Sequence, residues 1–505
     1  MVDWENPSSV GKLRSPWAFL EVALEAAFEK KHEKSMYDFA IIGAGVTGAG
    51  VARALSRYKV NVCLIEKADD VSSGASKANS GIVHGGYAAK NATLKGRLNV
   101  LGNRMFEDLN HHLNFGYRKT GGLVLAFDEG ERLLLDDLLR NGKNNGVKDL
   151  EIIKRNRILE LEPNLNPDVK YALYAKDVGV TSPYEYTIAL AENAVTNGVD
   201  LFLEHEVLDI IRMESSFELV TDRKNIKAHN VINAAGVFSD AISKMAGVND
   251  FKIIPRKGQY ILFQKGTGAA VKSVVFQVPT KKGKGILVTS TYHGNLMLGP
   301  NSEEVENRED TRTEEMALEY IINTARKSLP DFDLKKKLKT FSGIRPTPNT
   351  GDFIIKEEFP GFINAAGIES PGLTSSPAVA EMILNIIKKR ISLEQKNSFD
   401  PYREPIIKPN SFDAAEIKRR IDLAPCDDRI VCRCERVTEG EVRDALTRKI
   451  DIRTRKAVKM RTRAGMGFCQ GKFCGSRVDE LIERIKSPSQ HLPPAIKTPV
   501  SRNRN

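Results

Sequence analysis

Three glycines at fixed spacing are the first residues in this chain whose types and positions point to a chemistry. Gly43, Gly45 and Gly48 form the pattern G-x-G-x-x-G directly after the apolar run 37–42. The first glycine of such a pattern permits a tight turn, the second lets backbone approach a pyrophosphate, and the third lets the following helix pack on its strand. Glu66 lies 23 residues after Gly43, where a carboxylate can accept hydrogen bonds from ribose hydroxyls and disfavours a 2′-phosphate. These residues predict a dinucleotide site.

Cysteines near the C-terminal end could hold a metal. Cys432 and Cys434 form C-x-C, and Cys469 and Cys474 form C-x-x-x-x-C after an interval of 34 residues. Four thiolates can enclose a [2Fe-2S] cluster or a zinc ion. Zinc sites more often use C-x-x-C pairs, so the spacing favours iron and sulfur, and Cys426 is left as a non-ligand.

Two further side chains are suited to substrate chemistry. His84 is the only imidazole in the small-residue segment 72–86, whose composition suits a chain that wraps closely around a ligand. It is a candidate general base, with a surface or structural histidine as the alternative. Arg345, in the sequence G-I-R-P, has a planar, permanently charged guanidinium that can grip phosphate or carboxylate with two hydrogen bonds. A structural salt bridge is the alternative for this arginine.

Taken together, the motifs resemble the glycerol 3-phosphate oxidase and dehydrogenase branch of the D-amino-acid-oxidase-like flavoproteins. The resemblance lies in N-S-G-x-x-H at 79–84, V-P-T-x-x-G-K-G at 278–285 and S-P-G-L-T at 370–374. The sequence R-T-R-A-G-M-G-F-C at 461–469 is similar to the ferredoxin-like, BFD-like tail of the anaerobic dehydrogenases in that branch. The resemblance implies FAD, rather than NAD, at the glycine-rich site and a [2Fe-2S] cluster on the four cysteines.

The resemblance also implies roles for individual residues. His84 would face the substrate as the catalytic base. The substrate-binding residues would be Ser80, Lys284, Arg345 and Ser370. The FAD-binding residues would be Gly43, Gly45, Gly48, Glu66, Val207, Ala235, Gly236, Gly343, Gly367, Gly372, Leu373 and Thr374. The cluster ligands would be Cys432, Cys434, Cys469 and Cys474.

The implied activity is FAD-dependent oxidation of a small phosphorylated polyol, sn-glycerol 3-phosphate, to dihydroxyacetone phosphate. Hydride would pass to flavin N5, and electrons would leave singly through the cluster. A 2-hydroxy acid dehydrogenase, acting on a compound such as 2-hydroxyglutarate, is one alternative, although the lysine-bearing segment 278–285 argues against it. A non-catalytic redox subunit is another, which intact His84, Lys284 and Arg345 disfavour.

To position these residues, strands and helices have to alternate around the glycine turn. The sequence predicts a helix from 46 to 58, several short strands between 201 and 232, a long strand in 253–264, further short strands in 274–300, and a helix from 374 to 389. The expected fold class is α/β. It comprises a Rossmann-like FAD-binding domain, an interleaved antiparallel-sheet (α+β) substrate domain and a small C-terminal helical iron–sulfur domain. The expected boundaries are 1–35 for an N-terminal extension, 36–115 with 182–250 and 340–395 for the FAD-binding domain, 116–181 with 251–339 for the substrate domain, 396–424 for a linker, 425–486 for the BFD-like [2Fe-2S] domain and 487–505 for a disordered tail.

Composition sets the outer limits on function. The chain has 505 residues, of which 41% are hydrophobic, as in ordinary globular proteins. No apolar run reaches the roughly 18 residues that suggest a membrane span, so no transmembrane segment is expected. Cysteines clustered for a metal suit a reducing compartment. The expected location is therefore the cytoplasm, with peripheral contact at the inner face of the cell membrane left open.

Charge is concentrated near the cysteines. The net charge is +11, and between Arg448 and Arg463 there are eight basic residues and one acid, Asp451. A solvated basic face is one interpretation. The other is a docking surface for an electron-accepting protein subunit with an acidic face. No nucleic acid is expected as a partner, because no recognition module or aromatic interleaving accompanies the charge.

Overall fold

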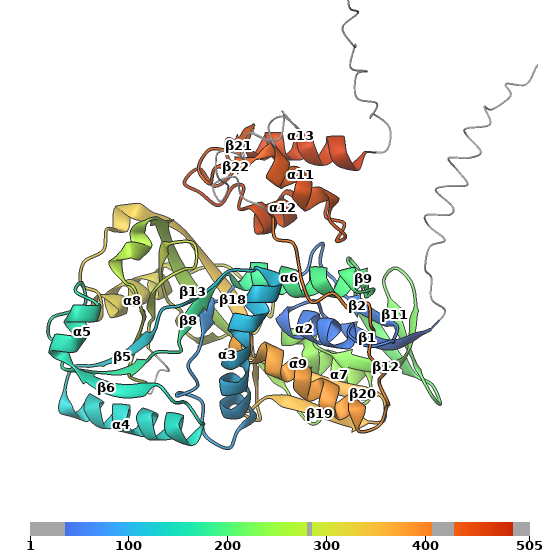
Figure 1. The fold of residues 1–505 in the computed structure, drawn as a ribbon, viewed down its shortest axis with the longest axis horizontal. Helices are drawn as coiled ribbons and strands as arrows, with labels where there is room; N and C mark the ends of the chain where they lie inside the picture. The colour runs from blue at the N-terminus through green and yellow to red at the C-terminus, as the bar shows by residue number, and fades with distance from the viewer. Residues whose placement is uncertain (1–35, 280–284, 407–428, 488–505) are drawn as a thin grey trace, which may run out of the picture.

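The computed structural model describes residues 36–279, 285–406 and 429–487 (Figure 1). Several sequence predictions fall outside these ranges. They are the N-terminal extension, Lys284, most of the linker, Cys426 and nearly all of the tail.

The first sheet carries the glycine turn. Its strands, in spatial order, are β10 (Val207–Arg212), β11 (Phe217–Thr221), β12 (Ile226–Asn233), β1 (Tyr37–Ile42), β2 (Val62–Ile65) and β9 (Asp200–Phe202), with β20 (Phe362–Ala366) paired to β12 and to β19 (Ile354–Phe359). The pairs of β1 with β2 and β12, of β2 with β9 and of β12 with β20 are parallel. This parallel centre is the arrangement expected of a Rossmann-like domain.

Helices cover both faces of this sheet, because alternate side chains of β1 point to opposite sides. Phe39 and Ile41 pack in one core with the helices α2 (Val46–Leu55), α6 (Pro183–Thr196) and α9 (Gly372–Lys388). Ala40 and Ile42 pack on the other face with α7 (Ser239–Met245). The predicted helix after the glycine turn is therefore present but three residues shorter at its C-terminal end.

The second sheet stands beside the first. Its strands, in spatial order, are β17 (Glu303–Glu304), β13 (Ile253–Lys265), β16 (Asn295–Leu298), β15 (Val288–Ser290), β14 (Val274–Gln277), β5 (Gly122–Ala126), β7 (Tyr171–Ala175) and β6 (Leu150–Lys154), with the long β18 (Lys337–Pro348) paired to β13. The sequence predicted an antiparallel sheet. One pair in it, β5 with β14, is parallel.

Helix α3 (Leu94–Leu113) has 20 residues, and the sequence analysis did not predict it. The side chain of Thr93 accepts a hydrogen bond from the Gly96 amide and so caps its first turn. The helix packs on α9 and α6, beside the segment that carries His84. The helices α4 (Glu129–Asn144), α5 (Arg155–Leu161) and α8 (Glu315–Arg326) flank the second sheet.

The C-terminal unit is small and mainly helical. It consists of β21 (Ile430–Cys432), β22 (Val437–Thr438), α11 (Glu439–Thr447), α12 (Arg455–Thr462) and α13 (Gly475–Lys486). Thr438 and Glu441 form a capping box at the start of α11. In Figure 1 this unit lies over α6, with α12 on the side of the first sheet and α13 on the far side. Within the described ranges, no helix is both long and apolar enough to cross a membrane. The domain boundaries stay predictions.

Candidate functional site

The glycine turn after β1 leaves no room for side chains. Gly43 has φ +101°, and a Cβ placed there would lie 2.5 Å from the carbonyl oxygen of Ala234. A Cβ on Gly48 would lie 1.9 Å from the carbonyl oxygen of Gly43. The turn therefore brings the N-terminus of α2 close to the end of β1. There the amide of Val46 donates to Oγ of Ser76 at 2.8 Å, so exposed amides and a hydroxyl meet where a phosphate could bind.

Glu66 follows β2 and closes the opposite side of the same site. Its carboxylate accepts hydrogen bonds from the amides of Ala44, at 2.9 Å, and Ala68, at 3.0 Å. Burial raises the pKa of Glu66, although these two amides and Lys67 act against the shift. The carboxylate thus stands beside the glycine turn, as the dinucleotide prediction requires.

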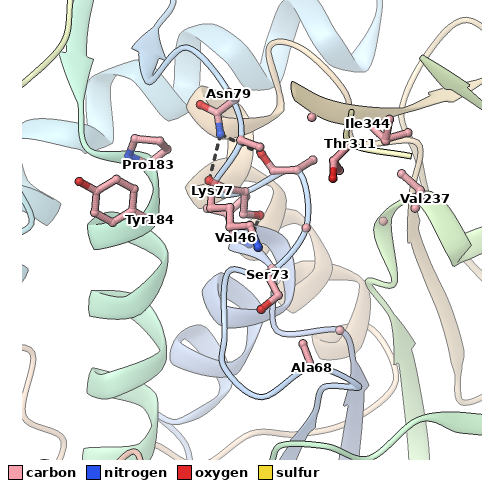
Figure 2. A pocket seen from close by; sticks show the side chains of 18 of the residues that line it. Val46, Ala68, Ser73, Lys77, Asn79, Pro183, Tyr184, Val237, Thr311 and Ile344 are labelled. Atoms are coloured by element: carbon pink, nitrogen blue, oxygen red, sulfur yellow. Dashed lines mark hydrogen bonds between the residues drawn. The ribbon is translucent and has the colours of Figure 1, made fainter. Parts of the chain in front are cut away.

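These residues line a first cavity of about 870 Å³. Figure 2 shows Pro183 and Tyr184 on one side of it, Val237 and Thr311 on the other, and Lys77 on the loop between them. The predicted cofactor residues on its wall are Gly43, Gly45, Glu66, Val207, Ala235, Gly236 and Gly343. Gly48 does not line the wall, because it packs against the carbonyl group of Gly43.

A second cavity of about 820 Å³ adjoins the first. Ala78, Asn79, Ser80 and Gly343 line both cavities, so the two chambers meet at the small-residue segment and β18. The predicted site residues on the second wall are His84, Ser80, Arg345, Ser370, Gly343, Gly372 and Leu373. The structure therefore brings the predicted base and three of the four predicted substrate residues to one chamber.

Hydrogen bonds from distant elements fix the backbone of His84. This residue follows β3 (Ile82–Val83), and its amide donates to Oγ1 of Thr374 at 2.9 Å. Its carbonyl oxygen accepts from Nδ2 of Asn103 on α3 at 3.0 Å. Thr374 lines neither cavity, and the structure instead places it behind His84. Gly367 also lines neither cavity. It packs against Pro348 instead, and a Cβ there would lie 2.7 Å from this proline.

Two arginines stand side by side on the second wall. Arg256 on β13 and Arg345 on β18 are directly opposite each other in the strand register, and both line the chamber. Nη2 of Arg345 donates to the carbonyl oxygen of Asn301 at 3.1 Å. Burial raises the pKa of the nearby Tyr260, and the charge of Arg345 acts against this shift. The sequence analysis missed Arg256. Arg256 is revealed only by the pairing of β13 with β18, two strands that lie far apart in the sequence.

Glu369, for which the sequence suggested no role, belongs to the frame of this chamber. It accepts hydrogen bonds from Nζ of Lys95 at 2.7 Å and from Oγ1 of Thr347 at 2.8 Å. The first bond joins α3 to the loop before α9. The carboxylate of Glu369 thereby balances the positive charge of Lys95, which lines the chamber.

The four predicted cluster cysteines lie in the C-terminal unit as two pairs. Cys434 lies beside Cys469, and Cys474 lies beside Cys432. Cys432 and Cys474 are buried, whereas Cys434 is exposed. Burial and the neighbouring Cys432 raise the pKa of Cys474. In the described part of the chain, no three His, Cys, Asp or Glu side chains are gathered tightly enough to hold a metal ion. The four thiols nevertheless interact with one another, which fits a cluster with four sulfur ligands.

The C-terminal unit is joined to the flavin-type domain by buried ion pairs. The guanidinium of Arg461 on α12 binds Asp70 through two hydrogen bonds of 2.7 and 3.0 Å, and its side chain is 0% exposed. Glu192 on α6 faces Arg403 at 2.5 Å and Arg448 at 3.4 Å. Burial acts against the charge of Glu192, but the surrounding arginines outweigh it and lower its pKa.

These contacts bear on the basic stretch at 448–463. Six of its eight basic residues form ion pairs within the chain: Arg448, Arg453, Arg455, Lys456, Arg461 and Arg463. Three of these six, Arg448, Lys456 and Arg461, reach acids outside the C-terminal unit and form a seam between domains. Lys456, Lys459, Met460 and Arg463 also line the first cavity. Docking of an acidic partner on this stretch stays a prediction.

Comparison with known proteins agrees with this geometry. The sequence profile of the family described as FAD dependent oxidoreductase matches residues 38–386, most of the chain. The chain belongs to this family. The profile of the BFD-like [2Fe-2S] binding domain matches residues 430–484 of the flavoprotein. The predicted fold class and the predicted cofactors, FAD and a [2Fe-2S] cluster, are confirmed.

Named relatives share most of its length. It is 46% identical to a glycerol 3-phosphate dehydrogenase of Caloramator mitchellensis, with 89% of this chain and 94% of the relative covered. It is 24% identical to a subunit of the anaerobic glycerol-3-phosphate dehydrogenase of Escherichia coli K12, with 90% of each covered. A solved L-alpha-glycerophosphate oxidase of Mycoplasma pneumoniae with FAD bound superimposes with a TM-score of 0.70 at 29% identity, over 73% of this chain and 99% of the oxidase.

The residues present fit FAD. The first cavity offers glycine backbone, the Ser76 hydroxyl and a buried carboxylate, and the second adjoins it through Gly343, where a Cβ would lie 2.1 Å from the carbonyl oxygen of Ala78. The two chambers together are large enough for an extended dinucleotide and a small substrate.

Proposed function

We propose that this flavoprotein oxidises sn-glycerol 3-phosphate to dihydroxyacetone phosphate. The observation that carries the proposal is the second chamber, which His84, Arg256 and Arg345 all line. Oxidation of an alcohol needs a group that accepts the hydroxyl proton, and a phosphate needs fixed positive charge with several donors. The relatives named for glycerol 3-phosphate or glycerophosphate support this choice.

His84 accepts the proton of the C2 hydroxyl in this proposal. Thr374 and Asn103 hold its backbone from two helices, so the ring keeps a fixed place while substrate enters. Arg345 and Arg256 hold the phosphate, and Ser80 and Ser370 hold the remaining oxygens. Lys284, which lies outside the described residues, keeps its predicted role beside the phosphate.

FAD would supply the hydride acceptor, and the [2Fe-2S] cluster would supply the single-electron carrier. The proposed FAD contacts are Gly43, Gly45, Glu66, Val207, Ala235 and Gly236 in the first chamber and Gly343, Gly372 and Leu373 at the second. Gly48, Gly367 and Thr374 support them from behind. Cys432, Cys434, Cys469 and Cys474 are the proposed cluster ligands.

The position of α12 supports electron transfer within the chain. Its residues Lys459 and Met460 line the first chamber, and the loop that follows α12 carries Cys469. That loop itself reaches the chamber at Met466, three residues before Cys469, so it links the dinucleotide chamber to the proposed cluster. Delivery of electrons to a separate protein subunit on the cytoplasmic side, where thiols stay reduced, completes the proposal.

An anaerobic titration tests the substrate. sn-Glycerol 3-phosphate added to the oxidised protein should bleach the flavin absorbance. Glycerol should do so only at far higher concentration, because it has no phosphate for the two arginines. Bleaching by 2-hydroxyglutarate, with no response to glycerol 3-phosphate, would make the chain a 2-hydroxy acid dehydrogenase, since guanidinium groups also bind carboxylates. No bleaching by either compound would favour the non-catalytic alternative.

A further inference from the structure

The C-terminal unit has an apolar face that the flavin domain does not cover. Phe468 is 75% exposed and Phe473 is 82% exposed. Among the described residues, only Met316 on α8 is a more exposed large apolar side chain, at 84%. Exposed aromatic rings are a typical mark of a protein interaction site, where such rings are enriched, and here two lie five residues apart in one loop of a small domain.

This face lies at the proposed cluster ligands. Phe468 directly precedes Cys469, and Phe473 directly precedes Cys474. The loop that carries them is packed on the C-x-C segment, because a Cβ at Gly467 would lie 2.3 Å from Cβ of Cys434. Cys434 itself is exposed. Of the proposed ligands, Cys434 therefore borders solvent directly, Cys432 and Cys474 are buried, and α12 faces the flavin domain.

The rim of the face is positively charged. Segments 429–436 and 466–478 together contain five lysines and arginines and a single acid, Glu435. The side chain of Glu435 is 3% exposed and is paired with Arg463 at 2.9 Å, so it does not offset the rim. The exposed cations are Arg429, Arg433, Arg436, Lys472 and Arg477. These residues differ from the basic stretch at 448–463, whose charge is largely used inside the chain.

We propose that this face, with Phe468 and Phe473 at its centre and the five cations at its rim, docks a one-electron carrier protein that has an acidic rim around its redox centre. Apolar contact at the centre excludes water, and opposite charges at the rim steer the encounter. The proposal rests on the proposed function only for the source of electrons. Each CH–OH oxidised to C=O releases two electrons and two protons, so two carriers leave with one electron each and the protons pass to water.

The test separates docking from catalysis. Protein reduced by dithionite is mixed in a stopped-flow instrument with the acidic haem domain of cytochrome b5 or with basic cytochrome c, and the second-order rate constants are compared. Phe468→Ser/Phe473→Ser and Lys472→Glu are the test variants. Met316→Ser, which removes an equally exposed apolar side chain from α8, is the matched control. Turnover of glycerol 3-phosphate with phenazine methosulfate, a small dye, reports the proposed function independently.

The wild type should reduce the acidic carrier faster than the basic one, and salt should slow only the acidic reaction. The double Phe variant should lose about tenfold in this rate constant, and Lys472→Glu about threefold at low salt. Dye turnover and iron content should stay unchanged, as should the Met316→Ser control. Unchanged rates in the double variant, or an equal loss of dye turnover and iron, would overturn the proposal. Absence of dye turnover in the wild type would refute the proposed function but leave the stopped-flow comparison valid.

Discussion

The two chambers of this flavoprotein are built in different ways. In the first, the part that should hold the pyrophosphate is a backbone cradle, which consists of backbone and small residues from two short, continuous stretches, the turn at 43–47 and the loop at 73–80. In the second, the groups suited to substrate chemistry are side chains from distant parts of the chain, including His84, Arg256 and Arg345. A tight turn tolerates no added atoms at its crowded glycines, whereas a side-chain chamber can lose a group and keep its shape. Mutations in the first should therefore remove the cofactor, and mutations in the second should remove activity alone.

The largest expected effect is at Gly48. In Gly48→Ala the new Cβ would lie 1.9 Å from the carbonyl oxygen of Gly43. The turn therefore has to open, and its backbone amides no longer point toward the phosphate position. We expect purified protein with little or no FAD and a lower melting temperature, measured by absorbance and calorimetry. Gly74→Ala is the matched control, because Gly74 lines the same chamber and has no atom within 4 Å of the added Cβ. Normal FAD content in Gly48→Ala would contradict the backbone-cradle account.

The second largest effect should be at His84. His84→Asn removes the proton acceptor, and general-base catalysis typically contributes ~10²- to 10⁴-fold. We expect this loss in kcat for glycerol 3-phosphate, with FAD content and melting temperature at wild-type values. A variant that loses FAD together with activity would show that the two chambers are not independent.

How far the sequence predicts each chamber follows from the same difference. Gly43, Gly45 and Glu66 could be identified because their spacing encodes a local strand, turn and helix. His84 and Arg345 were predicted from a resemblance, and Arg256 was missed because its place depends on the register of β13 against β18. Helix α3 was also missed, although Thr93 is a helix-capping residue and Leu98, Phe106, Leu109 and Leu113 recur at helical spacing and are buried. The inter-domain pairs of Arg448, Lys456 and Arg461 could not be predicted, because their acidic partners, Glu192, Asp69 and Asp70, lie more than 250 residues away in the chain.

The third prediction asks whether the first chamber depends on the C-terminal unit. Arg461→Met leaves Asp70 buried without its partner, and removal of one member of a buried pair typically costs ~3 to 5 kcal/mol. We expect a clear fall in the free energy of unfolding and faster loss of FAD on dilution, because α12 lines that chamber.

The matched variant for this pair is Asp70→Asn, combined with Arg461→Met in a double-mutant cycle. The double variant should be less damaged than the sum of the single variants, since no unpaired buried charge remains. Strict additivity would mean that the two residues act independently and that the seam is held elsewhere.

The smallest expected effect concerns the paired arginines of the second chamber. A charged hydrogen bond contributes ~1.5 to 3 kcal/mol, so Arg345→Ala and Arg256→Ala should each lower kcat/KM for glycerol 3-phosphate by roughly 10- to 150-fold. Turnover of glycerol should change far less, because it presents no phosphate to either guanidinium. Arg345→Lys keeps the charge but not the fork, and should recover part of the loss. An equal loss on both substrates would assign the two arginines to the fold of β13 and β18, and the side-chain chamber would then be as intolerant of change as the backbone cradle.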